Sequence, residues 1–244
     1  MEIYNNILKF DELSSTNTYA FELVKREKVE EFTTIYTLNQ TEGKGQRGNV
    51  WLSESGKNAL FSVILFPVQI SPVQQFIISQ CVSLSMLHVL EKYCFNVSIK
   101  WPNDIYVNDK KIAGILIENI IQSGLMSPCV VGIGINCNQL HFDKSLPNPT
   151  SILIETGKEI DAEKIVKSFI KELSELYNKL PYNFDVIRNM YKEKLYKKGL
   201  YSLFEDEKGE FIGRIFDVDD DGKILIIDKE GKQRKYFFKE VVYK

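Results

Sequence analysis

Residues 97–121 read VSIKWPNDIYVNDKKIAGILIENII, a segment in which strand-like runs follow one another at short intervals. Its β-branched and apolar runs predict strands over Val97–Lys100, Ile105–Val107 and Ile112–Ile121. Asn108-Asp109, between the last two runs, is typical of a tight hairpin turn. The stretch therefore predicts neighbouring strands of one sheet.

Further strands and helices are predicted on both sides of this stretch. The strands are expected over Ile7–Phe10, Thr33–Leu38, Ala59–Phe66 and Cys129–Ile135. Helical periodicity and capping residues predict helices over Asn17–Lys28, Pro72–Tyr93, Asp161–Leu180 and Phe184–Lys198. Gly199 should end the last helix.

After Gly199 the pattern changes to short alternating strands separated by glycine and aspartate turns. These strands are expected over Tyr201–Phe204, Glu210–Val218, Lys223–Asp228 and Gln233–Phe238. The pattern predicts a small β-barrel. We therefore expect two domains, residues 1–198 and residues 199–244.

Composition excludes several classes of protein. Hydrophobic residues make up 44% of the 244 residues and charged residues 26%, as in an ordinary globular chain. The net charge of -2 opposes sequence-independent binding to nucleic acid. We see no leader peptide and no apolar run near the ~20 residues of a membrane span, so we expect a cytoplasmic protein without a membrane partner. The cysteines lack C-x-x-C spacing and are expected to be reduced core residues: Cys81, Cys94, Cys129 and Cys137.

Gly43-Lys44-Gly45-Gln46-Arg47-Gly48-Asn49, here called the glycine loop, lies within a polar segment, residues 39–57. Its glycines would let backbone amides approach a ligand, and its two cations would neutralise phosphate or carboxylate charge. A strand rather than a helix is expected next, which opposes a dinucleotide-binding motif, and Asn49 replaces the lysine of a Walker A loop. A solvated loop with turn glycines is the alternative.

Lys100-Trp101-Pro102-Asn103-Asp104 is the second motif, and the following hairpin should bring Lys111 back towards Asp104. A lysine beside the small residues Ala113 and Gly114 can place its ammonium against a phosphate or an oxyanion. The alternative is a surface lysine and an ordinary turn. In Gly132-Ile133-Gly134-Ile135-Asn136 alternating glycines would leave room for a flat ligand, although strand glycines also mark bulges or close packing.

Taken together in this order and spacing, the motifs resemble the catalytic domain of biotin protein ligases over residues 8–240. The resemblance implies an α+β fold in which helices flank a mixed central β-sheet, as in class II synthetases, with a small C-terminal barrel. It also implies the reaction. Biotin and ATP form biotinyl-AMP, and biotin is then transferred to a lysine of a biotin carboxyl carrier protein.

The resemblance assigns roles residue by residue. It implies catalytic roles for Lys111, Asp104 and Arg47. Biotin would be contacted by Ser15, Thr16, Asn17, Gln40, Gly43, Lys44, Lys111 and Gly114. The ATP side would be lined by Lys44, Gln46, Arg47, Asn49, Trp51, Asn103, Asp104 and Asn136. Mg²⁺ would be carried mainly by the ATP phosphates, and the sequence identifies no protein ligands for it.

Partners and alternatives complete the prediction. The resemblance is compatible with a homodimer, and DNA binding is not expected because the motifs begin near residue 15. Gln46 stands where relatives often carry arginine, so we expect weaker retention of the adenylate. The alternatives are a lipoate or octanoate ligase, a non-catalytic biotin- or carrier-binding module, and a nucleic-acid-binding barrel, which the acidic run Asp217–Asp221 opposes.

Overall fold

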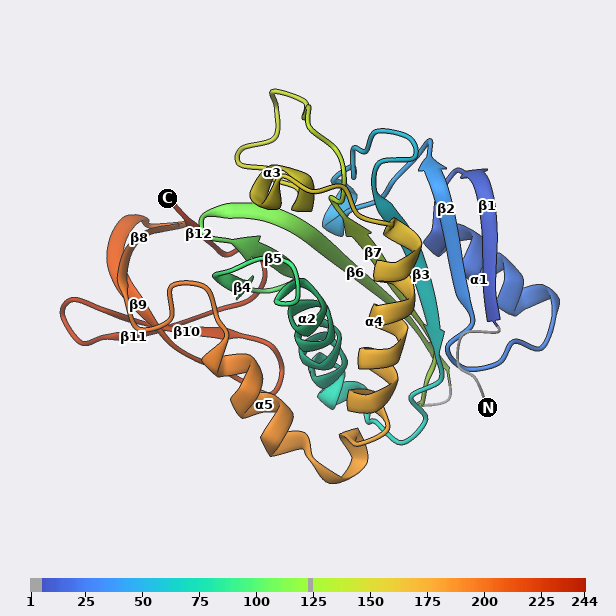
Figure 1. Cartoon of the computed structure of the whole chain (residues 1–244). Coiled ribbons are helices and arrows are strands. Elements are labelled where there is room, and N and C mark those ends of the chain that lie inside the picture. The colour runs from blue at the N-terminus through green and yellow to red at the C-terminus, as the bar shows by residue number, and fades with distance from the viewer. Residues whose placement is uncertain (1–5, 123–124) are drawn as a thin grey trace.

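A seven-stranded mixed sheet forms the centre of the protein in the computed structural model, which describes residues 6–122 and 125–244 (Figure 1). Its strand order is β1-β2-β3-β7-β6-β5-β4. Only the β1–β2 pair is parallel among these described strands. The strands are β1 (Ile7–Leu13), β2 (Thr34–Gln40), β3 (Ala59–Leu65), β4 (Val97–Lys100), β5 (Asp104–Val107), β6 (Lys110–Gln122) and β7 (Leu125–Ile135).

Helices cover both faces of this sheet. The helices are α1 (Thr16–Arg26), α2 (Phe76–Leu90), α3 (Ile152–Thr156), α4 (Ala162–Tyr177) and α5 (Phe184–Glu193). Successive strand residues point to opposite faces, and the two buried clusters follow that alternation. Ile35 and Ile64 pack with Ala20 of α1, whereas Tyr36 and Val63 belong to the cluster under α2 and α4. The predicted α+β fold with a mixed, helix-flanked sheet is confirmed.

The C-terminal strands form a second, small antiparallel sheet where the small barrel was predicted. It has five strands, in the order β11-β10-β9-β8-β12. Its strands are β8 (Tyr201–Asp206), β9 (Gly209–Val218), β10 (Ile224–Asp228), β11 (Gln233–Tyr236) and β12 (Val241–Tyr243). Within the described residues its edge strands β11 and β12 do not pair with each other, but the sheet curls so that Arg234 and Tyr236 of β11 reach Asp206 of β8.

The two sheets share one core. Phe204, Ile215 and Ile226 of the second sheet belong to the same buried cluster as α2 and the central sheet. The indole Nε1 of Trp101 donates a hydrogen bond to the carbonyl of Gly222 at 2.8 Å, which ties the β4–β5 turn to the second sheet.

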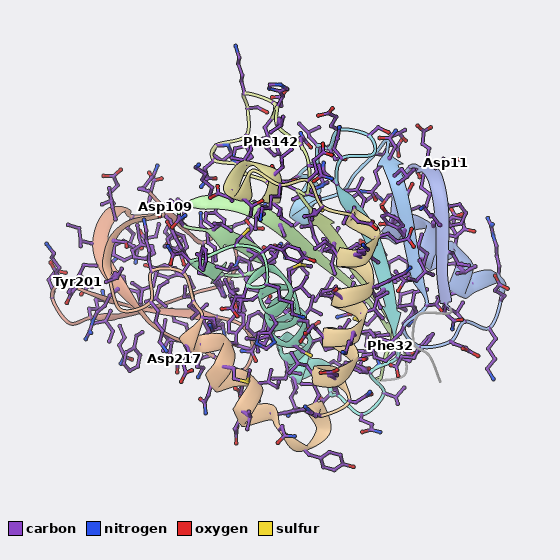
Figure 2. All side chains as sticks on the ribbon, viewed as in Figure 1. Asp11, Phe32, Asp109, Phe142, Tyr201 and Asp217 are labelled. Atoms are coloured by element: carbon purple, nitrogen blue, oxygen red, sulfur yellow. The ribbon has the colours of Figure 1, made fainter. Side chains whose placement is uncertain are left out.

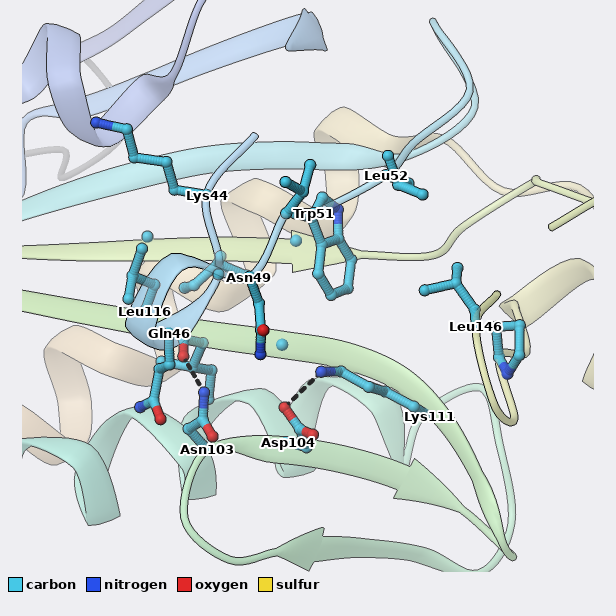
Figure 3. A pocket seen from close by; sticks show the side chains of 18 of the residues that line it. Lys44, Gln46, Asn49, Trp51, Leu52, Asn103, Asp104, Lys111, Leu116 and Leu146 are labelled. Carbon is cyan, nitrogen blue, oxygen red and sulfur yellow. Dashed lines mark hydrogen bonds and ion pairs between the residues drawn. The ribbon is translucent and has the colours of Figure 1, made fainter. Parts of the chain in front are cut away.

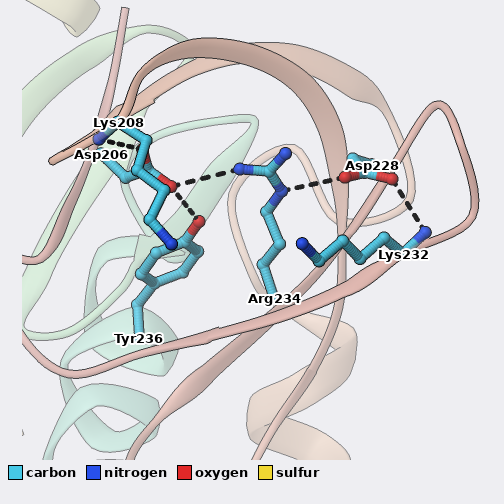
Figure 4. Close-up of polar contacts among 6 residues, drawn as sticks. All are labelled: Asp206, Lys208, Asp228, Lys232, Arg234 and Tyr236. Carbon is cyan, nitrogen blue, oxygen red and sulfur yellow. Dashed lines mark hydrogen bonds and ion pairs between the residues drawn. The ribbon is translucent and has the colours of Figure 1, made fainter.

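On its inner face the second sheet also carries a polar network (Figure 4). Arg234 lies between two carboxylates, with Nε 2.9 Å from Asp228 and Nη1 3.2 Å from Asp206. The Tyr236 hydroxyl donates to Asp206 at 2.6 Å. Both carboxyl side chains are almost fully buried, so the guanidinium compensates for their desolvation.

The last predicted helix is wrong at its C-terminal end. It was expected to run to Lys198, but α5 ends at Glu193. The next residues instead pair with the edge of β4: Ile99 donates to the carbonyl of Lys194, and Tyr196 donates to that of Ile99, both at 2.8 Å. Tertiary hydrogen bonding therefore overrides local helical propensity here.

The expectation about apolar runs also needs a correction. The helical segment Pro72–Leu90 spans 19 residues and is long and apolar enough to cross a membrane. However, 72% of its most apolar 18-residue window is buried inside the fold, as in the core helix of a globular protein. The predicted helix start at Pro72 is a 3-10 turn, Pro72–Gln74, and α2 proper begins at Phe76.

Candidate active site

A cavity of about 780 Å³ opens over one face of the central sheet (Figure 3). It collects nearly all of the predicted site residues, although they are far apart in the sequence. Its walls include Ser15, Thr16, Asn17, Gln40, Lys44, Gln46, Asn49, Trp51, Asn103, Asp104, Lys111, Gly114, Gly132, Gly134 and Asn136. Gly43 is adjacent and buried, and the side chain of Arg47 lies outside the described part of the structure.

Lys111 and Asp104 form an ion pair in this cavity. The hairpin of β5 and β6 brings Lys111 back beside Asp104, as the sequence predicted, and Nζ lies 2.7 Å from Oδ1. Both side chains stay partly accessible, at 32% and 23% exposed. Because the carboxylate already holds the lysine ammonium in position, the ammonium can contact an incoming anion with little reorganisation.

The indole of Trp51 lies over the two strand glycines of the cavity floor. A Cβ added at Gly114 would stand 2.7 Å from the Trp51 ring, and one at Gly134 would also collide with it. Lys111 Nζ lies 5.5 Å from the ring centroid, within cation–π range. Trp51 Nε1 is buried and has no hydrogen-bond partner among the described residues. The two glycines therefore leave space for a flat group, as predicted, and the indole of Trp51 occupies part of that space.

The start of α1 is fixed in the cavity wall by a buried polar network. Gln40 Oε1 accepts from the backbone amide of Thr16 at 2.8 Å and from its hydroxyl at 3.1 Å. Ser62 Oγ lies 2.7 Å from Thr16 Oγ1 and 2.6 Å from Asn17 Oδ1. Asn17 Nδ2 donates to Glu118 at 2.7 Å. These contacts fix the side chains of Thr16, Asn17 and Gln40, to which the resemblance assigns biotin binding.

Ser15 takes the N-cap position that its sequence context suggests, but its side chain makes no capping hydrogen bond. Its hydroxyl is therefore not committed to the helix, as a ligand-binding role requires. Ser62 and Glu118 were not predicted as part of the site. The signal for Ser62 was a single hydroxyl in the otherwise apolar run ALFSVIL, which forms the fully buried strand β3.

The glycine loop is a small ordered hairpin rather than an irregular loop. Lys44 and Val50 form an antiparallel bridge, and a 3-10 turn spans Gln46–Gly48. Gly48 has φ +83°, a conformation that favours glycine. Lys44 Nζ donates to Thr18 on α1 at 2.9 Å, and Asn49 and Trp51 extend towards Lys111 (Figure 3). The loop thus forms a roof over the ion pair.

Two of the predicted asparagines line the cavity and also donate hydrogen bonds to backbone carbonyls. Asn103 Nδ2 donates to the carbonyl of Ile115 at 2.6 Å. Asn136 is buried, and its Nδ2 donates to the carbonyl of Thr150 at 2.9 Å. Both therefore position strand ends of the cavity, whatever contact they make with a ligand.

Sequence reasoning missed two further walls of the cavity. One is the loop before α3, which contributes Phe142, Ser145, Leu146, Pro147, Asn148 and Pro149. Lys111 donates its backbone amide to the carbonyl of Asn148 at 2.8 Å, so this loop is attached beside the ion pair. The other is formed by Phe238 and Lys239 of the C-terminal turn and by Val242 of β12. Phe238 packs edge-on against Trp101, with ring centroids 5.3 Å apart.

The described residues hold no group of three or more His, Cys, Asp and Glu side chains that could bind a metal ion. Asp104, the cavity carboxylate, is already paired with Lys111. The four cysteines are free and buried, as predicted. Burial raises the pKa of Cys137 to about 12, so its thiol is protonated at neutral pH and is a poor nucleophile.

Comparison with known proteins agrees with this site. The family described as biotin/lipoate A/B protein ligase matches residues 9–136, more than half of the chain. "Bifunctional ligase/repressor BirA" of Bacillus subtilis is 28% identical over 236 residues, which cover 95% of this chain and 72% of BirA. "Biotin--[acetyl-CoA-carboxylase] ligase" of Paracoccus denitrificans is 26% identical, with 82% and 85% covered.

Among solved structures, the biotin protein ligase from Aquifex aeolicus in complex with biotin and ATP superposes with a TM-score of 0.81 at 27% identity. The alignment covers 99% of each chain, so both sheets have counterparts in that protein. The shared fold, the family match and the motif residues gathered in one cavity lead to one conclusion: this chain belongs to the biotin/lipoate A/B protein ligase family.

Proposed function

We propose that the protein is a biotin protein ligase that activates biotin with Mg-ATP and transfers it to a lysine of a biotin carboxyl carrier protein. The observation that carries this proposal is the Lys111–Asp104 pair under the glycine loop, in a cavity large enough for a small acid and a nucleotide. Relatives named as biotin ligases and the Aquifex complex with biotin and ATP support the choice of substrates.

In the first step an oxygen of the biotin carboxylate would attack the α-phosphorus of ATP, and the bond to the β-phosphate would break to release pyrophosphate. Two anions must meet in this step. The Lys111 ammonium, oriented by Asp104, would supply positive charge at the reacting oxygens. Mg²⁺ would enter with ATP and offset the phosphate charge. Ser15, Thr16, Asn17 and Gln40 would hold the far end of biotin.

In the second step the amine of the carrier lysine would attack the carbonyl carbon of biotinyl-AMP. The amide C–N bond forms, the C–O bond to AMP breaks so that AMP leaves as the phosphate anion, and the proton lost by the amine would pass through the Asp104 carboxylate to solvent. Asp104 would orient that amine, which is otherwise mostly protonated at neutral pH, and its position beside Lys111 supports this role. We propose a cytoplasmic location, and a homodimer stays a prediction.

The test is biotin-dependent exchange of labelled pyrophosphate into ATP by the purified protein, with lipoate as the comparison acid. We expect exchange with biotin, and a loss of at least 100-fold in Lys111→Ala because a transition-state charge contact is removed. Lys110→Ala is the matched control, since Lys110 is the neighbouring, more exposed lysine, 3.6 Å from Glu155, and is not part of the cavity wall.

Exchange with lipoate alone would show that lipoate, not biotin, is the substrate. Lipoate is the other acid in the family description. No exchange with either acid would favour a non-catalytic binding module. An equal loss in both lysine variants would mean that Lys111 has no special role.

A further inference from the structure

Lys100, the last residue of β4, lies in the wall of the cavity beside the proposed reacting groups. In the register of β4 and β5 it is directly opposite Asp104, which lines the same cavity. The Cβ atoms of such cross-strand neighbours are ~5 Å apart. Lys100 therefore stands next to the carboxylate that we propose to orient the acceptor amine.

Aromatic rings, and not carboxylates, hold the Lys100 ammonium. Its Nζ donates to the Tyr106 hydroxyl at 3.0 Å and lies 4.7 Å from the Tyr106 ring centroid. Tyr243 of β12 approaches from the second sheet, with its ring centroid 4.9 Å from Nζ. Lys100 makes no ion pair within the described residues, whereas Asp104 is paired with Lys111. The two rings thus position the ammonium without neutralising its charge.

The rings that hold Lys100 are themselves fixed by packing. Tyr196 packs against Tyr106 and against Tyr243, with ring centroids 5.2 and 5.9 Å apart. The Tyr196 hydroxyl donates to Asp109, which is labelled in Figure 2. Burial raises the pKa of Tyr243, so this tyrosine carries no negative charge at neutral pH. The charge of Lys100 therefore stays at one place in the cavity wall.

A fixed cation at this place matters most for the transfer step. The acceptor lysine must lose a proton before it can attack a carbonyl, and it is mostly protonated at neutral pH. Two negative charges would face it, the Asp104 carboxylate and the phosphate of biotinyl-AMP, and both favour its ammonium form. Lys111 offsets one of them. Lys100 offsets the other, because a like charge nearby favours loss of the proton.

One further cation lines the cavity, and it is less suited to this task. Lys239 belongs to the C-terminal turn and is exposed to water, which screens its charge. Lys100 is partly buried between the two tyrosine rings, where screening by water is weaker. The charge of Lys100 should therefore act on the acceptor amine more strongly than that of Lys239.

Resting on the proposed function, we propose that Lys100 is an electrostatic positioning residue of the transfer step, whose charge favours the neutral form of the acceptor amine beside Asp104. The proton leaves through the Asp104 carboxylate to solvent, the amine attacks the carbonyl carbon of biotinyl-AMP, and AMP leaves. Lys100 itself exchanges no proton. Adenylate formation involves no amine, so it should not need this charge.

The test measures the two half-reactions separately in the full-length protein. Chemically prepared biotinyl-AMP and a folded biotin carboxyl carrier domain are mixed with enzyme, and single-turnover transfer is followed from pH 6 to pH 10. Lys100→Met keeps the packing against both rings but removes the charge. We expect its transfer rate to be about tenfold below wild type at pH 7, because one pKa unit changes the neutral fraction of the amine tenfold. The two rates should converge towards pH 10.

Two further variants complete the experiment. Lys100→Arg restores the charge and should recover most of the rate at pH 7. Lys223→Met is the matched control, since Lys223 also lies over a ring, 4.2 Å from the Phe237 centroid, but is paired with Asp221 and is not part of the cavity wall. Its transfer profile should match wild type. Pyrophosphate exchange should stay within about twofold of wild type in Lys100→Met, which also shows that this variant is folded.

An unchanged transfer profile in Lys100→Met would overturn the proposal. So would a loss of equal size at every pH, because Lys100 would then act through packing. A raised KM for ATP in pyrophosphate exchange would make Lys100 a phosphate ligand and would also overturn it. If the wild-type protein neither exchanges pyrophosphate nor transfers biotin from supplied biotinyl-AMP, the proposed function itself is refuted.

Discussion

Trp51, assigned to the ATP side, and the two strand glycines beneath it fix the shape of the cavity floor. Because Gly114 and Gly134 have no side chains, the indole can rest on the strands β6 and β7, and its Nε1 is buried without a partner in the part of the chain that the structure describes. A buried donor without an acceptor costs free energy of ~1–3 kcal/mol. The ring is thus held by shape, and a small change in the floor should move it.

We therefore predict that Gly134→Ala displaces Trp51. The added methyl group would collide with the indole, and overpacking of this kind costs ~1–3 kcal/mol. Because Trp51 is assigned to the ATP side, pyrophosphate-exchange kinetics should show KM for ATP raised at least tenfold. The double variant Gly134→Ala/Trp51→Phe, with a smaller ring, should recover part of the loss. Ile133→Val, a conservative change in the same strand, is the control, and an equal effect there would refute the steric explanation.

Individual site residues could be predicted when they lie in one hairpin or one motif. The Lys111–Asp104 contact follows from a local turn at Asn108-Asp109, and Asn108 has φ +52° there. Contacts made by distant segments were missed. Asn148 reaches Lys111, and Phe238 reaches Trp101, only because the whole topology brings them together. Neither segment carries a motif that identifies its partner.

At the scale of elements, the second sheet depends on a buried charge network. The Tyr236 hydroxyl holds the pKa of Asp206 below its ordinary value. Burial alone would raise the pKa of Asp228, but hydrogen bonds from Arg234 and the Lys232 amide outweigh it, so that pKa is also lowered. A carboxyl with a lowered folded-state pKa stabilises the protein above its unfolded pKa of ~3.9 and loses that contribution as the pH falls towards the folded value.

Arg234→Met should accordingly destabilise the protein by ~3 kcal/mol at pH 7, since it leaves two buried carboxylates without their cation. The loss should be smaller near pH 3, where those carboxyls take up protons more readily once the guanidinium is gone. Urea unfolding followed by circular dichroism at both pH values would measure it. Arg214→Met, an exposed arginine of the same sheet, should change stability by less than ~0.5 kcal/mol. A pH-independent loss in Arg234→Met would contradict the electrostatic explanation.

Strand and helix positions followed from the sequence where apolar periodicity was strong, as in β3 and α4. Errors arose where tertiary pairing decided the outcome. The chain leaves its helix after Glu193 because the next residues pair with β4. Strand β12 was missed because three residues are too few to show a periodic pattern. Closure of the second sheet depends on whether two edges meet, which strand periodicity alone does not specify. The sequence therefore predicted the small C-terminal β unit but not how its edge strands lie.

For the molecule as a whole, the division into domains 1–198 and 199–244 stays a prediction. The hydrophobic core, however, continues across the boundary between these two segments. Because Phe204, Ile215 and Ile226 pack in the same cluster as α2, neither part should unfold alone. We expect one cooperative transition in urea. Tryptophan fluorescence, which senses the Trp101–Gly222 contact between the parts, and far-ultraviolet circular dichroism should share a midpoint. Separate midpoints would show independent domains.

The pairing of residues 194–196 with β4 has a further consequence, for solubility during folding. An open strand edge attracts strands of other chains, and aggregation often begins there. Leu195 bridges Ile99 and partly covers one edge of the central sheet, so a truncation before residue 194 would uncover it. At the other edge β1 carries Lys9, Asp11 and Glu12, and these charges discourage the addition of a foreign strand. Newly made protein should therefore be most prone to aggregate in the interval before its last fifty residues have been synthesised and docked.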